Sequence, residues 1–284
     1  MTLAILVGIL STVQLHLAKA LQRQGIEALN QIRDRIRKTG GPVEKDIRKP
    51  IIYTVGVVLN NTVFIYPLLA QRYAPPAVFT SMFGVGLVAL MLYAWRVLRE
   101  PITREIAAGA VAIVVGTLII GIENIGRGEY DRSGMAVGPT LALIGAFFVL
   151  GLLLVLTTTR WKGTRWIGFA FGFFAGGCGS LDPFLKGVAQ NLSGRPELIP
   201  VSLVGMGIFI SSFIIGFLAF LITQIGFARQ APASVLVPVY NATYIVLPVA
   251  LQAVLLPSYR LYASTIFGIA LILFGVVLMR GLRR

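Results

Sequence analysis

The sequence is poor in the residues that build disulfides, metal centres and catalytic clusters. It contains one cysteine, Cys178, and one histidine, His16, so an intrachain disulfide and a zinc cluster of Cys and His ligands are both excluded. Asp and Glu together number only 11. A membrane-embedded, lipid-handling enzyme generally needs paired acids or a histidine cluster, so the chain is not expected to be an enzyme.

Charge of either sign is also scarce. Only 13% of the residues are charged and 56% are hydrophobic, whereas a soluble domain is about half apolar and about a quarter charged. The formal net charge of +14 would suggest nucleic-acid binding in a soluble protein. Here the charges lie between apolar blocks, where membrane topology explains them, and no nucleic-acid partner is expected.

The sequence is rich in long apolar blocks. Each approaches the ~20 residues that a helix needs to cross ~30 Å of hydrocarbon. Because lipid offers no hydrogen bonds to the backbone, each block is expected to form a helix. The first block follows no positive charge and precedes many, which favours a retained span over a cleaved signal peptide. The predicted fold is an all-α polytopic membrane protein with nine transmembrane helices, at residues 2–21, 51–71, 76–97, 104–122, 136–158, 166–189, 199–226, 232–255 and 260–279.

The basic residues set the expected orientation. With the N-terminus outside, 19 of the 25 Lys and Arg residues fall on the inner side and 6 on the outer side. Cytoplasmic loops are enriched in Lys and Arg. The sequence therefore predicts a plasma- or inner-membrane protein with its N-terminus outside and its C-terminus in the cytoplasm.

The long loop at residues 22–50 falls on that inner side. Ile26, Leu29, Ile32 and Ile36 recur at helical spacing, and Arg33 lies among them with other basic residues. One interpretation is an amphipathic helix that lies on the anionic inner leaflet of the bilayer. The other is a solvated loop helix that only anchors the topology.

Two loops repeat each other. Residues 71–78 and 228–235 share Arg, Ala, Pro and Val at a constant offset of 157 residues, and Gly109 and Gly116 match Gly268 and Gly275. Four spans plus one linking span place the second copy upside down, an arrangement found in many secondary transporters. The sequence predicts a first repeat at residues 1–122, a linking helix with its loops at 123–165 and a second, inverted repeat at 166–284.

These features resemble a known superfamily. Residues 99–103, followed by the helix with Gly109 and Gly116, resemble the close of an EamA-like repeat of the drug/metabolite transporter superfamily. Residues 74–77 and 233–240, together with nine spans, are similar to NIPA-type magnesium transporters. The resemblance implies an inverted-repeat transporter with a central cavity. The second span departs from the NIPA-type pattern, because residues 59–62 include no carboxylate.

Asp182 is the one acidic residue well inside an apolar block, which makes it a candidate for binding substrate, a coupling ion or a proton. Pro183 is expected to break its helix locally. The alternative is a structural ion pair with Lys186, one helical turn away. If the chain carries a cation, Asp182 is also its candidate metal ligand.

Span 1 supplies three polar candidates. Gln14 is the preferred cavity residue. His16 is interpreted as a hydrogen-bonded packing residue, with a proton shuttle as the alternative. Lys19 is expected to extend to the inner interface.

Span 8 carries a dense polar group between Pro238 and Pro248, which we expect to break that helix twice. The alternative to substrate contact there is hydrogen bonding between helices. The full set of candidate substrate-binding residues is Gln14, Asn60, Asn61, Asp182, Gln224, Tyr240, Asn241 and Tyr244. A stripe of small residues in span 6, at Gly168, Gly172 and Gly176, predicts a close approach by another helix.

The function expected from these residues is secondary active transport of a small polar or amphipathic organic solute by alternating access. A NIPA-type carrier of magnesium or another divalent cation is the alternative, and a lipid-handling enzyme is the alternative from another class. No cofactor is expected. The expected partners are the solute or ion and the lipid bilayer, and the oligomeric state stays open between monomer and homodimer.

Overall fold

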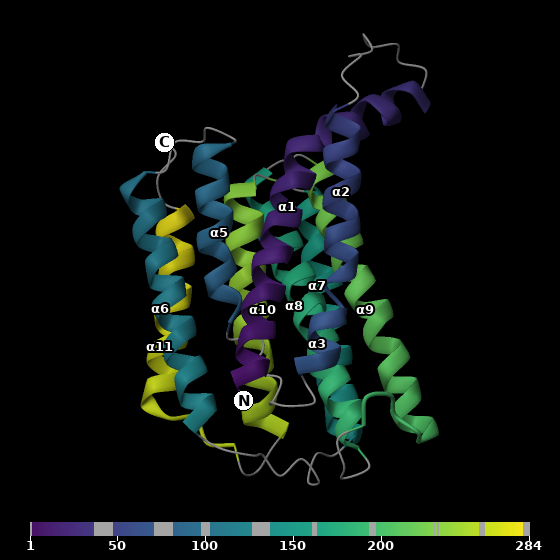
Figure 1. The fold of residues 1–284 in the computed structure, drawn as a ribbon, viewed down its shortest axis with the longest axis vertical. Helices are drawn as coiled ribbons and strands as arrows, with labels where there is room; N and C mark the ends of the chain where they lie inside the picture. The colour runs from purple at the N-terminus through teal and green to yellow at the C-terminus, as the bar shows by residue number, and fades with distance from the viewer. Residues whose placement is uncertain are drawn as a thin grey trace.

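The computed structural model describes residues 2–36, 48–70, 82–97, 103–126, 137–160, 164–192, 197–229, 231, 233–255 and 259–280. All regular secondary structure in these ranges is α-helical (Figure 1). The ten helices are α1 (Thr2–Ile36), α2 (Arg48–Thr62), α3 (Ile65–Ala70), α5 (Phe83–Arg96), α6 (Arg104–Gly126), α7 (Val137–Arg160), α8 (Thr164–Asn191), α9 (Leu203–Ala228), α10 (Ala233–Leu255) and α11 (Ala263–Arg280).

Length and composition make this an integral membrane protein, as the sequence predicts. Four helices, α1, α7, α9 and α10, contain stretches long and apolar enough to cross a bilayer, and α5, α6 and α11 contain shorter apolar stretches. Their outward faces carry large apolar side chains such as Leu153, Ile214 and Phe267, each more than half exposed. Contact of such faces with lipid carries no free-energy penalty, whereas their exposure to water would be unfavourable.

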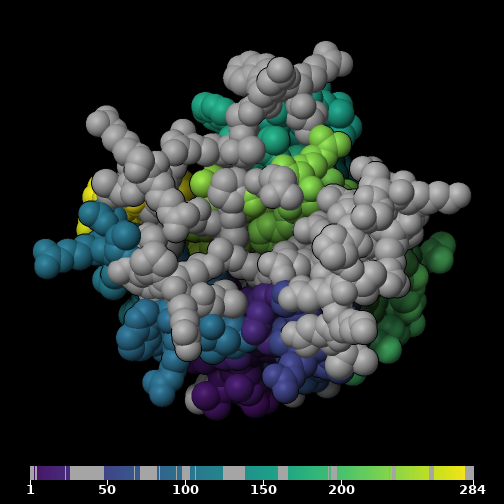
Figure 2. All heavy atoms as spheres, turned by 90° about the horizontal axis from the view of Figure 1, so that it is seen from above, coloured from purple at the N-terminus to yellow at the C-terminus, as the bar shows by residue number. Residues whose placement is uncertain are grey.

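The chain passes up and down through one bundle in which α10 lies at the centre (Figures 1 and 2). The apolar stretch of α10 is 78% buried, against 22% for α7 and 28% for α9. Gly172 and Gly176 of α8 allow the close approach, because a Cβ on either would meet the backbone carbonyl of Leu236 or Tyr240. The predicted small-residue stripe therefore packs against α10.

The second predicted span is divided into two helices, a feature that the sequence did not predict. α2 ends at Thr62 and α3 begins at Ile65. Pro67 has no N–H to donate to the carbonyl four residues earlier, that of Val63. The N–H of Tyr66 donates to that carbonyl instead, at 3.1 Å, which tightens the turn between the two helices.

Three expected helix breaks are wrong. α8 continues through Pro183, and α10 continues through both Pro238 and Pro248. A proline removes one backbone hydrogen bond, and neighbouring helices can hold a membrane helix together across that gap. Irregular backbone therefore lies between α2 and α3 rather than in span 8.

The loop predicted to be cytoplasmic begins as a helix that belongs to span 1. α1 runs for 35 residues, so residues 22–36 continue span 1 without a break, and the end of the helix extends beyond the bundle (Figure 1). Residues 37–47, the loop segments at 71–78 and most of the motif at 99–103 lie outside the described residues. Contact of the loop with a leaflet stays a prediction.

The glycines matched by sequence also meet in space. α6 packs along α11, where Gly116 contacts Gly268 and Gly109 contacts Gly275 at distances that leave no room for a Cβ. At the end of this helix pair, Ser264 and Thr265 both donate hydrogen bonds to the carboxylate of Glu123.

Candidate functional site

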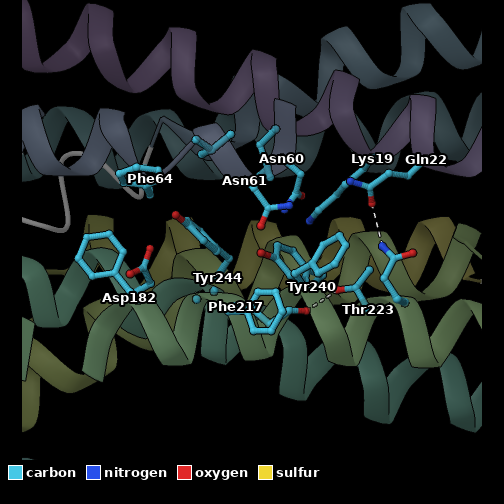
Figure 3. Close-up of a pocket in the computed structure, with 18 residues that line it drawn as sticks. Lys19, Gln22, Asn60, Asn61, Phe64, Asp182, Phe217, Thr223, Tyr240 and Tyr244 are labelled. Atoms are coloured by element: carbon cyan, nitrogen blue, oxygen red, sulfur yellow. Dashed lines mark hydrogen bonds between the residues drawn. The ribbon is translucent and has the colours of Figure 1, made fainter. Parts of the chain in front are cut away.

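A cavity of about 220 Å³ lies inside the bundle, between α1 and α2 on one side and α8, α9 and α10 on the other (Figure 3). Drug-sized sites enclose roughly 300–1,000 Å³. The volume therefore suits a small solute. α1 faces the cavity with Leu15, Lys19 and Gln22, which are spaced at four and three residues and so share one helix face.

The opposite wall is aromatic. Tyr240 and Tyr244 of α10 stack with ring centroids 6.0 Å apart, and Phe213, Phe217 and Phe220 of α9 also line the cavity. Gly179 of α8 allows the Tyr240 hydroxyl to approach, because a Cβ at that position would collide with it. These rings form a wall on which a flat or apolar group can pack.

One carboxylate reaches the cavity from α8. Asp182 accepts a hydrogen bond from Lys186 in a short ion pair, in which the Lys186 side chain is 0% exposed and that of Asp182 is 15% exposed. The Lys186 ammonium also lies 4.0 Å from the centroid of the Phe213 ring. The sequence left an ion pair and a cavity group as alternatives for Asp182, and its carboxylate makes the pair and lines the cavity as well.

The lysine of α1 lies in a different setting. Lys19 is 5% exposed, lines the cavity and places its ammonium 3.1 Å from the centroid of the Tyr240 ring. Its ammonium makes no hydrogen bond within the described part of the chain. The expectation that Lys19 extends to the membrane interface is wrong, because α1 passes along the cavity and Lys19 lies on the face that lines it.

A hydrogen-bond chain crosses one end of the cavity. Tyr53 of α2 donates its hydroxyl to Gln224 Oε1 at 3.1 Å. Gln224 Nε2 donates to Gln22 Oε1 at 2.8 Å, the bond drawn at Gln22 in Figure 3. Gln22 Nε2 in turn donates to the Gly56 carbonyl at 3.0 Å. These hydrogen bonds join α1 and α2 to α9.

A second glutamine joins the bundle near the end of α8. Gln190 Nε2 donates to the carbonyls of Leu68 in α3 and Leu198, at 3.2 and 3.0 Å. α1 and α8 run in opposite directions through the bundle (Figure 1). The contacts of Gln22 and Gln190 therefore lie toward opposite ends of the molecule.

The structure brings six of the eight candidate residues to the cavity. Two lie elsewhere. Gln14 bonds to Leu59, Thr62 and Tyr66 and so fastens α1 to α2 and α3. Asn241 is fully buried against His16, between α10 and α1. The six that line the cavity are Asn60, Asn61, Asp182, Gln224, Tyr240 and Tyr244.

The adjacent residues Asn60 and Asn61 both line the cavity, although neighbours on a regular helix point in different directions. α2 ends directly after them, which explains how both reach it. His16 hydrogen-bonds the Thr12 carbonyl through Nδ1 at 2.8 Å and is fully buried, as expected of a packing residue.

Lys19, Gln22 and the phenylalanines of α9 are cavity residues that the sequence did not predict. The spacing of Leu15, Lys19 and Gln22 on one helix face was the available signal for the first two. For the phenylalanines there was none, because α9 is apolar on every side and its pattern does not distinguish a cavity face from a lipid face.

The chain matches no protein-family model, and neither the curated proteins nor the solved structures contain a match to it.

Proposed function

We propose that the chain is a secondary transporter that carries a small organic solute across the membrane by alternating access. The observation that carries this proposal is the cavity of about 220 Å³ among five helices from both halves of the chain. Aromatic rings, amides and few ionisable groups line it, as in sites that bind small organic molecules. No enzymatic activity is part of the proposal.

The inverted repeat is the architectural part of the proposal. In the first half α1 packs against α2 and α5, and in the second half α8 packs against α9 and α10. Under a two-fold axis, each residue of one half has an equivalent residue in the other half. Whenever two residues are in contact, their two equivalents must therefore be in contact as well. By sequence, Gly109 is equivalent to Gly268 and Gly116 to Gly275. The contact of Gly116 with Gly268 therefore requires a contact of Gly275 with Gly109, and the structure contains both. They support two halves of four spans, residues 1–122 and 166–284, with α7 linking them, and hence nine spans.

The glutamine contacts at opposite ends suggest how access alternates. Opening the cavity toward the end near Gln22 requires separation of Gln224 from Gln22 and Tyr53. Opening it toward the other end requires separation of Gln190 from Leu68. Rocking of the two halves would break one set while keeping the other. With the N-terminus outside, as the basic residues predict, the Gln22 end faces the cytoplasm.

A magnesium carrier of NIPA type is the second candidate, and the sequence resemblance favours it. The cavity favours an organic solute instead. Mg²⁺ prefers carboxylate and water ligands, whereas Asp182 already pairs with Lys186 and Lys19 adds a positive charge. Membership of the drug/metabolite transporter superfamily is compatible with either substrate.

Uptake into proteoliposomes tests the proposal. The purified chain is reconstituted and assayed for uptake of labelled carboxylates, amides, amines and Mg²⁺, beside protein-free liposomes. We expect saturable uptake of at least one organic solute and none of Mg²⁺. Gly179→Val adds bulk where Tyr240 enters the cavity and should reduce that uptake about tenfold or more, the loss that one or two misplaced contacts cause.

Gly145→Ala is the matched control, because a Cβ at Gly145 meets nothing within 4 Å. It should transport like the wild type. Uptake of Mg²⁺ alone would establish the second candidate instead. Uptake of no solute, by protein that elutes as a single folded species, would contradict transport altogether.

A further inference from the structure

The cavity contains a buried lysine, with a formal positive charge, that the described residues leave without a counter-ion. Lys19 is 95% removed from solvent, and its ammonium has no hydrogen-bond acceptor among them. The ammonium lies over the face of the Tyr240 ring, 3.1 Å from its centroid. A cation–π contact offsets only part of the cost of burying an ammonium, so this arrangement favours an anion beside Lys19.

The other charged groups do not supply that anion. Asp182 is the one carboxylate among the described lining residues, and it is paired with Lys186. Asp182 and Lys19 also lie toward opposite ends of the cavity, with Tyr240 and Tyr244 between them (Figure 3). The ion pair is neutral as a unit, so the described lining carries a net charge of one, and Lys19 holds it.

Polar groups around the ammonium can complete an anion site. The amides of Asn60 and Asn61 line the same cavity as Lys19 and point toward its side chain in Figure 3. Asn61 Nδ2 uses one hydrogen on the Val57 carbonyl and retains a second. An oxyanion placed here would meet one ammonium and amide donors on one side and the Tyr240 ring on the other.

We infer that Lys19 binds the anionic group of the transported solute, and that the substrates are small organic monoanions of the carboxylate class. This inference rests on the proposed transport function and specifies its substrate. One buried cation balances one negative charge, so a monoanion fits better than a divalent phosphate ester. The remainder of the solute packs on the Tyr240 and Tyr244 rings.

Binding of matched pairs of compounds tests the inference. Nicotinate and nicotinamide have nearly the same shape and differ in charge, and lactate and lactamide form an aliphatic pair. The shift of the unfolding temperature of the purified, full-length protein is measured against concentration for each compound. At least one carboxylate should stabilise the wild type in a saturable way while its amide does not.

Lys19→Met should weaken that carboxylate at least tenfold, because a hydrogen bond to a charged group is lost. Lys19→Arg keeps the charge and should retain more of the response than Lys19→Met. Lys49→Met removes a lysine that does not line the cavity and should respond like the wild type. Uptake of the same carboxylate should fall in parallel with its binding.

Two results would overturn the inference. One is a wild type that no carboxylate of the panel stabilises more than its amide. The other is a Lys19→Met variant that retains the wild-type response. Transport of a neutral or cationic solute would leave the transport proposal in place and remove this one. Carboxylate binding that depends on Lys19, without uptake, would retain the anion site and contradict transport.

Discussion

The two buried lysines of the bundle make an instructive comparison. Lys19 lies in the middle of α1 and Lys186 near the end of α8, and both ammonium groups lie over an aromatic ring. Lys186 has Asp182 one turn before it on its own helix, whereas the residue at the same spacing before Lys19 is Leu15. The second half neutralises its charge internally, and the first half leaves its charge facing the cavity.

This difference separates a structural role from a binding role. In the proposed transporter, an ion pair within one helix would persist in every conformation and so would contribute little to a conformational change. A cation without an internal partner changes its energy when a solute anion arrives. The four predictions that follow test this contrast, beginning with the largest expected effect.

Asp182→Asn removes the partner of Lys186 while keeping the shape of the side chain. Breaking a buried pair from one side costs about 3–5 kcal/mol, because the remaining charge is left uncompensated. We expect a marked fall in the free energy of unfolding, measured by reversible denaturation in mixed micelles. The double variant Asp182→Asn with Lys186→Met should recover most of the loss. An Asp182→Asn variant as stable as the wild type would contradict the structural role of the Asp182–Lys186 pair.

Gly176→Ala tests the wall that holds the Tyr240 ring below Lys19. The new Cβ would press on the backbone of Tyr240 and push α10 away from α8. Overpacking of this kind costs about 1–3 kcal/mol. Thermal unfolding should register the loss, and carboxylate binding should weaken with it. Gly145→Ala, in open space on α7, should lose no stability, and equal effects of the two variants would contradict the close α8–α10 packing.

Gln224→Leu removes the hydrogen bonds that α9 makes with Gln22 and Tyr53. Such bonds contribute about 0.6 kcal/mol each between membrane helices, so the loss of stability should be about 1 kcal/mol. Gln14→Leu breaks bonds of similar number within the first half and serves as the control. Only Gln224→Leu should change the ratio of influx to efflux in proteoliposomes, and the same ratio in both variants would remove the proposed gate.

Lys19→Met should have the smallest effect on stability. It loses a cation–π contact worth about 2 kcal/mol at most and removes the cost of an uncompensated buried charge, so the net change in unfolding free energy should stay below about 1 kcal/mol. Lys186→Met leaves Asp182 without its partner and should be clearly less stable. Equal destabilisation by the two substitutions, in the same unfolding assay, would show that the lysines are equivalent.

The candidate site could be predicted in part. Asn60, Asp182, Tyr240 and Tyr244 were accessible to sequence analysis because polar groups in membrane spans face the protein interior. Gln14 and Asn241 satisfy the same rule and lie away from the cavity, where they contact neighbouring helices. The rule therefore predicts which side chains face the protein interior and not lipid. It does not predict which of them line a cavity and which lie between packed helices.

The amino-acid sequence is enough to identify a helical membrane protein, because the backbone of a run of about 20 apolar residues can form all its hydrogen bonds in lipid only as a helix. It also determined which glycines match across the two halves, since that match is a property of the chain alone. Which helix faces meet became clear only from the folded structure. The partner of Lys19 is a ring on α10, more than 200 residues away in sequence, and helical periodicity gives the direction of a side chain without saying what lies opposite it.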